Sequence, residues 1–199
     1  MDTLTLYATV QGSVEALTMA LHVRDDYTRF HCDRVVVLAK ELAEACGVRD
    51  KALDTLHLCA LFHDIGKIGI PDCVLLKPGR LDPDEWTLMK THSTLGESLF
   101  RSAALDCVDE VAPVIRHHHE AFDGSGYPDG LSGERIPLLS RILLIADAYD
   151  AMARTRPYHQ ARPHGEIMAV MGSESGHKLD PGIFRTFSAL IGSSVARVH

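Results

Sequence analysis

The sequence contains no apolar run that is long enough to cross a membrane. Apolar stretches such as residues 142–146 are stopped after a few residues by a charged side chain, here Asp147, whereas a membrane-spanning helix needs about 18 apolar residues or more. The first residues also lack a basic segment followed by an apolar one, so they do not resemble a signal peptide. We therefore expect a cytoplasmic protein without a membrane span.

A cysteine framework and an excess of positive charge are absent as well. The five cysteines are odd in number, and no pair has the spacing of a CxxC motif, which argues against disulfides and against a zinc–thiolate site. The formal net charge of −7 excludes bulk binding of nucleic acid, although a small phosphate-bearing ligand can still bind where local charges are positive.

Strand-like alternation of apolar and polar residues is also missing. Apolar residues instead recur at steps of three and four, as at Val35, Leu38 and Leu42, which predicts helices and an all-α domain. Asp82 and Asp180, each followed by proline, are expected to cap the helices that they precede. Helices are expected over residues 13–22, 28–46, 50–64, 83–101, 106–118, 137–153, 163–172 and 181–191, with long loops over 66–81 and 120–135.

Histidine is the residue type that stands out, with twelve in 199 residues. The strongest local signal is the pair His63–Asp64 at a predicted helix end, because both side chains can reach one divalent metal ion and the carboxylate can bridge to another. Asp147 interrupts an apolar helix, where an ionised carboxylate is costly to bury without a cation. Nitrogen and oxygen ligands without thiolate favour iron or manganese, with nickel, cobalt or zinc as alternatives.

A longer set of motifs resembles the HD-GYP phosphodiesterases, a subgroup of the HD metal-dependent phosphohydrolase superfamily. The resemblance covers about residues 24–190, so we expect residues 1–23 to form a short N-terminal helical extension and residues 24–199 to form the HD-GYP domain. The motifs that carry it are residues 63–72 (HDIGKIGIPD), 77–79 (KPG), 118–120 (HHE), 123–124 (DG), 126–128 (GYP), 146–151 (ADAYDA) and 156–158 (RPY).

The resemblance implies a compact bundle of about seven helices and the hydrolysis of cyclic di-GMP to linear pGpG, in many members continuing to GMP. A hydroxide that bridges two divalent metal ions would attack the phosphorus, Asp64 would bridge the ions, and Lys67 would stabilise the developing charge. The metal ligands that it implies, residue by residue, are His31, His63, Asp64, His92, His118, His119 and Asp147.

Further positions match parts of the family that contact the substrate or orient the ligands. His117 is expected to be solvated or to support the ligands from outside, and Trp86 and Phe100 are expected to pack in the core. The expected substrate contacts are Asp25, Tyr127 and Arg156, and the residues expected to orient the paired histidines are Glu120 and Asp123.

Two positions depart from the family pattern. Tyr27 stands where members with three metal ions carry glutamate, and a phenol is a poor ligand for a hard cation unless it is deprotonated, so two ions are favoured over three. His159 follows the RPY motif where a basic residue is common. A neutral imidazole would bind phosphate more weakly there than a cation does.

Several functional alternatives stay open at this point. One is hydrolysis of a related cyclic dinucleotide such as 3′,3′-cGAMP, and another is a module that binds a cyclic dinucleotide or a partner with little turnover. A nucleotidase of the wider HD superfamily is less favoured because of the GYP loop. A homodimer or a protein regulator is conceivable, and turnover measured against tight binding of intact ligand separates the enzyme from the binding module.

Overall fold

Helices form almost all the regular structure in the described part of the chain. The computed structural model describes residues 19, 26–103, 106–154, 161–194 and 196–197, and for residues 26–30 it describes the backbone alone. The expected all-α fold is confirmed, since the described residues add to the helices only one isolated β-bridge, between Ser175 and Leu179. None of the described helices combines the length and the apolar character that a membrane span requires. The helix predicted over 13–22 lies almost wholly outside the described residues.

The described part of the chain contains eight longer helices and several short helical elements. The longer ones are α2 (Asp26–Ala45), α3 (Lys51–Phe62), α5 (Pro83–Lys90), α6 (His92–Ser102), α7 (Val108–Arg116), α8 (Leu138–Ala153), α9 (His164–Glu174) and α10 (Pro181–Leu190). The short elements are the single-turn helix α4 (Asp72–Leu75) and the 3-10 turns η1 (Ile65–Gly69), η2 (Gly133–Arg135) and η3 (Ile191–Ser193).

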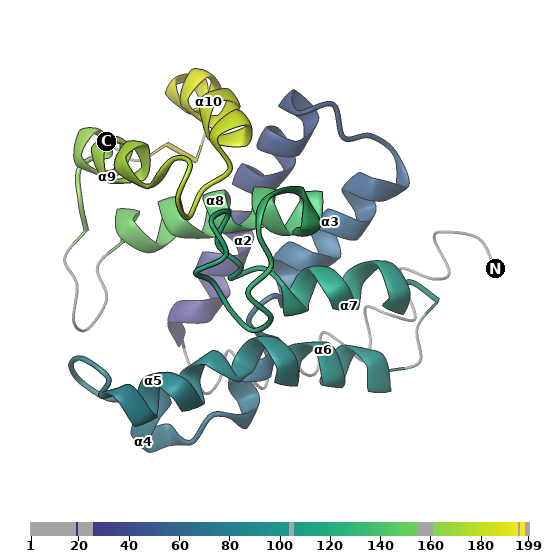
Figure 1. The fold of residues 1–199 in the computed structure, drawn as a ribbon, viewed down its shortest axis with the longest axis vertical. Helices are drawn as coiled ribbons and strands as arrows, with labels where there is room; N and C mark the ends of the chain where they lie inside the picture. The colour runs from purple at the N-terminus through teal and green to yellow at the C-terminus, as the bar shows by residue number, and fades with distance from the viewer. Residues whose placement is uncertain (1–18, 20–25, 104–105, 155–160, 195, 198–199) are drawn as a thin grey trace.

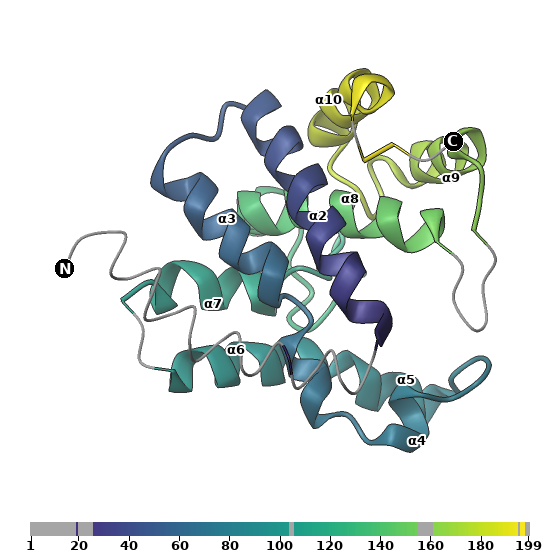
Figure 2. The ribbon, with the colours of Figure 1, turned by 180° about the vertical axis from the view of Figure 1, so that it is seen from behind.

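One hydrophobic core joins α2, α3 and the helices α6 to α10. Figure 1 shows α8 across the middle of the molecule, with α9 and α10 on one side and α6 and α7 on the other. Seen from behind in Figure 2, α2 and α3 lie side by side, and α2 packs against both α3 and α8. The periodic residues Leu38 and Leu42 are fully buried against Leu56, Ile142 and Leu143, which is the burial that their three- and four-residue spacing predicts.

The two predicted N-caps are confirmed. Asp180 Oδ1 accepts from the backbone N–H groups of residues 182 and 183 at 2.8 and 3.1 Å, and Arg141 Nη1 donates to the other oxygen at 2.6 Å. Asp82 forms a full capping box with Glu85 at the start of α5. Both carboxylates therefore satisfy helix N–H groups that otherwise lack partners, and Asp180 also ties α10 to α8.

Two predicted boundaries are wrong, and both lie close to predicted metal ligands, one after His63–Asp64 and the other at His92. The segment predicted as a loop over 66–81 contains most of η1 and all of α4, because Ile70, Val74 and Leu75 bury themselves in a small core of their own. The helix predicted over 83–101 is interrupted at Thr91, whose N–H bonds to Leu88 O three residues back. This tighter turn makes His92 the first residue of α6.

Glycine is required where η1 meets α6. A Cβ atom at Gly66 would lie 1.9 Å from the carbonyl oxygen of His92 and 2.5 Å from the nitrogen of Gly96. Only a residue without a side chain allows the two backbones to approach so closely. The close contact brings the segment after His63–Asp64 directly against the start of α6, where His92 lies.

Candidate metal centre

The seven predicted ligands converge from five parts of the chain, and together they are called the cluster below. The ligand atoms of His31, His63 and Asp64 lie within 4.8 Å of one another, and so do those of a second group formed by three histidines. Asp147 Oδ1 lies 3.1 Å from His31 Nε2 and so joins the first group. The second group consists of His92, His118 and His119.

Asp64 belongs to the first group and also faces the second. Its Oδ2 is 3.5 Å from His63 Nε2, and its Oδ1 is 3.6 Å from His92 Nε2. Its side chain is almost completely buried, so the carboxylate cannot be satisfied by bulk water. One oxygen faces each group, which is the arrangement that a carboxylate needs to contact two cations at once.

Three of the histidines are oriented in the same way by their own helix ends. The Nδ1–H of His63 donates to Ala60 O at 2.9 Å, and that of His92 to Met89 O at 2.8 Å. His118 repeats the pattern with Ile115 O at 2.5 Å. A proton held on Nδ1 leaves the lone pair on Nε2, and each Nε2 is directed at the cluster. The chain turns immediately after α3 and α7, which allows neighbouring residues to contribute ligands together.

His31 is oriented by a carboxylate of another helix, Asp150, for which the sequence motifs imply no role. Its Nδ1 donates to Asp150 Oδ2 at 2.7 Å, and Asp150 in turn accepts from Arg34 Nε and Nη2 at 2.6 and 2.9 Å. Carboxylates often orient a ligating histidine in this manner. The available signal was the spacing, since His31 and Arg34 on α2, like Asp147 and Asp150 on α8, are three residues apart and share a helix face.

The buried carboxylates stay ionised. Burial by itself would raise the pKa of Asp64, but the charges of Lys67 and of the surrounding histidines outweigh it and hold the pKa well below its usual range. Burial also opposes ionisation of Asp147, and its hydrogen bond and charge interaction with His31 more than compensate and lower its pKa. The cluster therefore presents two negative charges in its interior.

Most of the histidines, in contrast, are kept neutral. Burial lowers the pKa of His92 and, reinforced by neighbouring imidazoles, lowers that of His118 well below its usual range and that of His119 to about 3. His31 differs: burial would lower its pKa, but its hydrogen bonds with Asp147 and Asp150 raise the pKa to about 9. Neutral imidazoles and ionised carboxylates are the protonation states that metal binding requires, and His31 would release its proton to a cation.

The donor set fits divalent metal ions. His63 Nε2 is buried without a hydrogen-bond partner among the described residues, which is costly unless a cation uses its lone pair. His92 Nε2 and His118 Nε2 lie 3.3 Å apart, although each ring already has its proton on the other nitrogen. Two facing lone pairs repel each other, and a cation between them would remove the repulsion.

Lys67 and Tyr127 border the cluster. Lys67 Nζ donates to Asp64 Oδ2 at 2.7 Å and retains about a quarter of its side-chain exposure, so its ammonium lies beside the predicted bridging carboxylate. The Tyr127 ring lies 5.0 Å from that of His119 and 6.3 Å from that of His92, measured between centroids. Burial raises the pKa of the Tyr127 phenol, which keeps it neutral and able to donate.

The roles expected for Glu120 and Asp123 need correction. Glu120 is buried, but its oxygens accept from the backbone N–H groups of Asp129 and Leu131 at 2.7 and 3.0 Å, so it shapes the GYP loop instead of holding the paired histidines. Asp123 is exposed and accepts from the N–H of Ser125 at 2.9 Å. Both carboxylates organise the backbone of the loop that follows His118 and His119.

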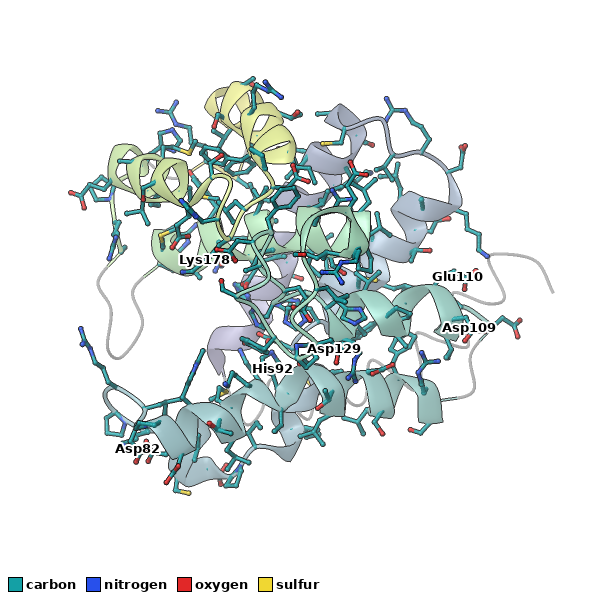
Figure 3. The ribbon with its side chains drawn as sticks, in the orientation of Figure 1. Asp82, His92, Asp109, Glu110, Asp129 and Lys178 are labelled. Atoms are coloured by element: carbon teal, nitrogen blue, oxygen red, sulfur yellow. The ribbon has the colours of Figure 1, made fainter. Side chains whose placement is uncertain are left out.

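His117 belongs to an ionic network that fixes the same loop to α7. Its Nε2 donates to Asp129 Oδ2 at 2.9 Å, and Arg116 donates to both oxygens of Asp129 at 2.7 Å. Arg116 also reaches Glu97 on α6 at 2.8 Å. Figure 3 shows His92 and Asp129 in the middle of the molecule, whereas Asp109 and Glu110 lie at its edge. His117 thus helps to fix the loop to α7, and its expected role as an outer support of the ligands stays a prediction.

Several predicted positions lie outside the described residues. These are the substrate candidates Asp25 and Arg156 and the departure His159, and the side chain of Tyr27 is likewise not described. Of the two aromatic residues expected in the core, only Phe100 lies there. Phe100 is buried and packs on Phe62, whereas Trp86 is 47% exposed and contacts Tyr127 instead of the core.

A helical domain that gathers neutral histidines and ionised aspartates into one buried cluster suits a metal-dependent hydrolase. The family model described as HD domain matches residues 15–183. The chain therefore belongs to the HD domain family, as its motifs predicted. Membership of this family implies divalent metal binding, which the cluster described above can provide.

Curated relatives align with most of this chain. The cyclic di-GMP phosphodiesterase response regulator RpfG of Xanthomonas campestris is 38% identical over 85% of this chain and 45% of its own length. A cyclic di-GMP phosphodiesterase of Thermotoga maritima is 38% identical over 89% and 48%, respectively. A 3′3′-cGAMP-specific phosphodiesterase of Vibrio cholerae is 34% identical over 86% and 37%. The chain thus spans about half the length, or less, of these relatives.

A solved structure has the same fold. Bd1817 of Bdellovibrio bacteriovorus, described as an HDG"Y"P protein, matches with a TM-score of 0.66 over 82% of this chain and 52% of its own, at 23% identity. At this level of identity the likeness supports the helical architecture of the domain.

Proposed function

We propose that the chain is a metal-dependent phosphodiesterase that hydrolyses cyclic di-GMP to linear pGpG, with further cleavage to GMP as a second step. The observation that carries the proposal is the buried Asp64 carboxylate between two groups of ligands. The similarity to curated cyclic di-GMP phosphodiesterases supports this choice of substrate. The five free thiols accord with a cytoplasmic location, which we propose as well.

The ligand groups suit two ions bridged by Asp64. His31, His63 and Asp147 would hold one ion and the second group of histidines would hold the other. Iron or manganese suits this nitrogen–oxygen set, with nickel, cobalt or zinc as alternatives. The tyrosine at position 27 in place of glutamate favours two ions over three. When bound, the ions would supply Lewis acidity that activates water and neutralises the phosphate charge.

Side chains around the ions would stabilise charge, position the substrate and hold the ligands in place. Lys67 extends its ammonium to the edge of the cluster, where it can stabilise negative charge on the phosphate oxygens or on the departing ribose oxygen. Tyr127 covers His119 and can donate a hydrogen bond to the substrate from its neutral phenol. Asp150 and Arg34 keep His31 in one orientation, which limits rearrangement of the cluster during turnover.

The test is turnover of cyclic di-GMP by protein loaded anaerobically with iron(II) or with manganese. We expect linear pGpG to accumulate first and GMP to follow, as separated by chromatography. The double variant His63→Ala, Asp64→Ala serves as the control for contaminating nucleases. Product formation no faster than in this control, with metal content confirmed, would contradict the proposal.

Hydrolysis of 3′,3′-cGAMP is the second candidate. It is favoured by the identity of 34% to a relative described as 3′3′-cGAMP-specific. Turnover of both cyclic dinucleotides by the same preparation separates the candidates, because the true substrate should show the higher kcat/KM.

A further inference from the structure

Trp86 is unusually exposed for its size and lies next to the cluster. It is the only tryptophan of the chain and keeps 47% of its surface accessible. Its helix, α5, buries none of its residues, so packing in the core does not explain the choice of an indole. Aromatic side chains commonly line ligand-binding sites, so an exposed indole this close to the predicted ligands is a candidate for contact with the substrate.

A continuous series of rings connects Trp86 with the ligands. Its ring centroid lies 6.1 Å from that of Tyr127, at an interplanar angle of 84°, and Tyr127 lies 5.0 Å from His119. In such an edge-to-face contact one ring offers only its edge. At least one face of the indole is therefore left unused by Tyr127, at the outer end of the series.

The charges near Trp86 indicate whether its free face suits a phosphate or a base. Around the start of α5, Asp82 and Asp84 carry negative charges that repel phosphate, whereas the charge of Glu85 is paired with the ammonium of Lys77. A phosphate attracted to the cluster would direct its ribose and base outward, past Tyr127. An uncharged aromatic base then suits the Trp86 surface better than a second phosphate does.

We propose that Trp86 stacks against one nucleobase of the cyclic dinucleotide while a phosphate occupies the cluster. This inference rests on the proposed function and adds the residue that holds the base. Stacking of a base on an aromatic side chain tolerates different bases. Trp86 therefore sets affinity for cyclic dinucleotides in general, without choosing between guanine and adenine.

Intrinsic fluorescence tests the proposal, because all tryptophan emission comes from Trp86. Metal-loaded wild-type protein is titrated with cyclic di-GMP, GMP or ribose 5-phosphate, and emission is read before appreciable turnover. We expect saturable quenching by cyclic di-GMP, quenching by GMP at higher concentration, and none by ribose 5-phosphate, which has no base. In steady-state assays Trp86→Leu should raise KM for cyclic di-GMP roughly ten- to a hundred-fold, with a smaller change in kcat.

Two variants provide matched controls. Trp86→Phe keeps an aromatic face and should recover most of the affinity, whereas Leu88→Ala removes another exposed apolar side chain of α5 and should leave KM unchanged. A KM for Trp86→Leu within about twofold of wild type, with wild-type turnover intact, would overturn the stacking role and leave the proposed function standing. Equal quenching by ribose 5-phosphate would also overturn the stacking role. Emission that changes with protein concentration alone would overturn it too, because it would indicate that a second copy of the chain covers the indole.

The reverse outcome separates the two proposals. Saturable, base-dependent quenching by cyclic di-GMP without any hydrolysis would support the stacking role and overturn the phosphodiesterase activity.

Discussion

Asp64→Asn is expected to abolish turnover of cyclic di-GMP while preserving the helical fold. The amide has nearly the shape of the carboxylate but lacks the charge that faces both ligand groups at 3.5 and 3.6 Å. Loss of a residue that only orients a metal ligand already costs about 10–100-fold. Loss of the predicted bridging ligand itself should cost more, so we expect kcat/KM to fall more than about 1,000-fold. Metal content, measured by mass spectrometry after dialysis, should fall together with activity.

Asp54→Asn is the matched control for this variant. Asp54 lies on α3, the same helix that precedes His63–Asp64, and is exposed to solvent. It should keep wild-type activity and metal content. Asp64→Asn protein that is folded by circular dichroism and still turns over at a rate near wild type would remove Asp64 from the site.

Lys67→Met should give the second-largest loss, but with a different signature. Methionine retains much of the length of lysine and lacks the ammonium that lies 2.7 Å from Asp64. If Lys67 stabilises charge in the transition state, kcat should fall roughly 100- to 1,000-fold with little change in KM, as for loss of an oxyanion-stabilising donor.

Metal content distinguishes this variant from Asp64→Asn. Lys67→Met should bind as much metal as wild type, because lysine is not among the proposed ligands, and Lys40→Met on the exposed surface of α2 should behave as wild type in both assays. A Lys67→Met protein that loses its metal would show that Lys67 acts on the cluster itself. Unchanged kcat would remove its catalytic role.

The sequence was informative wherever a residue's chemistry could be judged from its immediate neighbours. His63–Asp64 and the paired histidines 118 and 119 follow helix ends that glycine and apolar periodicity predict. Asp147 was conspicuous because an ionised group interrupts an apolar helix. The structure brings these residues together, and their roles as ligands stay predictions that metal analysis can test.

What the sequence did not indicate depends on contacts between distant segments. Asp150 orients His31 across 119 positions of sequence, and its three-residue spacing from Asp147 does not by itself show that this helix face meets α2. Glu120 looked like a partner of its histidine neighbours, yet the loop folds back and offers it the N–H groups of residues 129 and 131.

Exposure was equally hard to predict. Trp86 and Phe100 belong to one predicted helix, and core packing is the expectation for both. The interruption at Thr91 separates α5 from α6, so the two rings need not share a face. Phe100 then packs in the core, and Trp86 is left beside Tyr127.

Anomalous scattering from crystals of the iron- or manganese-loaded protein tests the central claim most directly. We predict two peaks, one among His31, His63, Asp64 and Asp147 and the other among Asp64, His92, His118 and His119, with Asp64 touching both ions. A single peak, or peaks away from these residues, would contradict the bridged centre. A third peak beside Tyr27 would contradict the count of two.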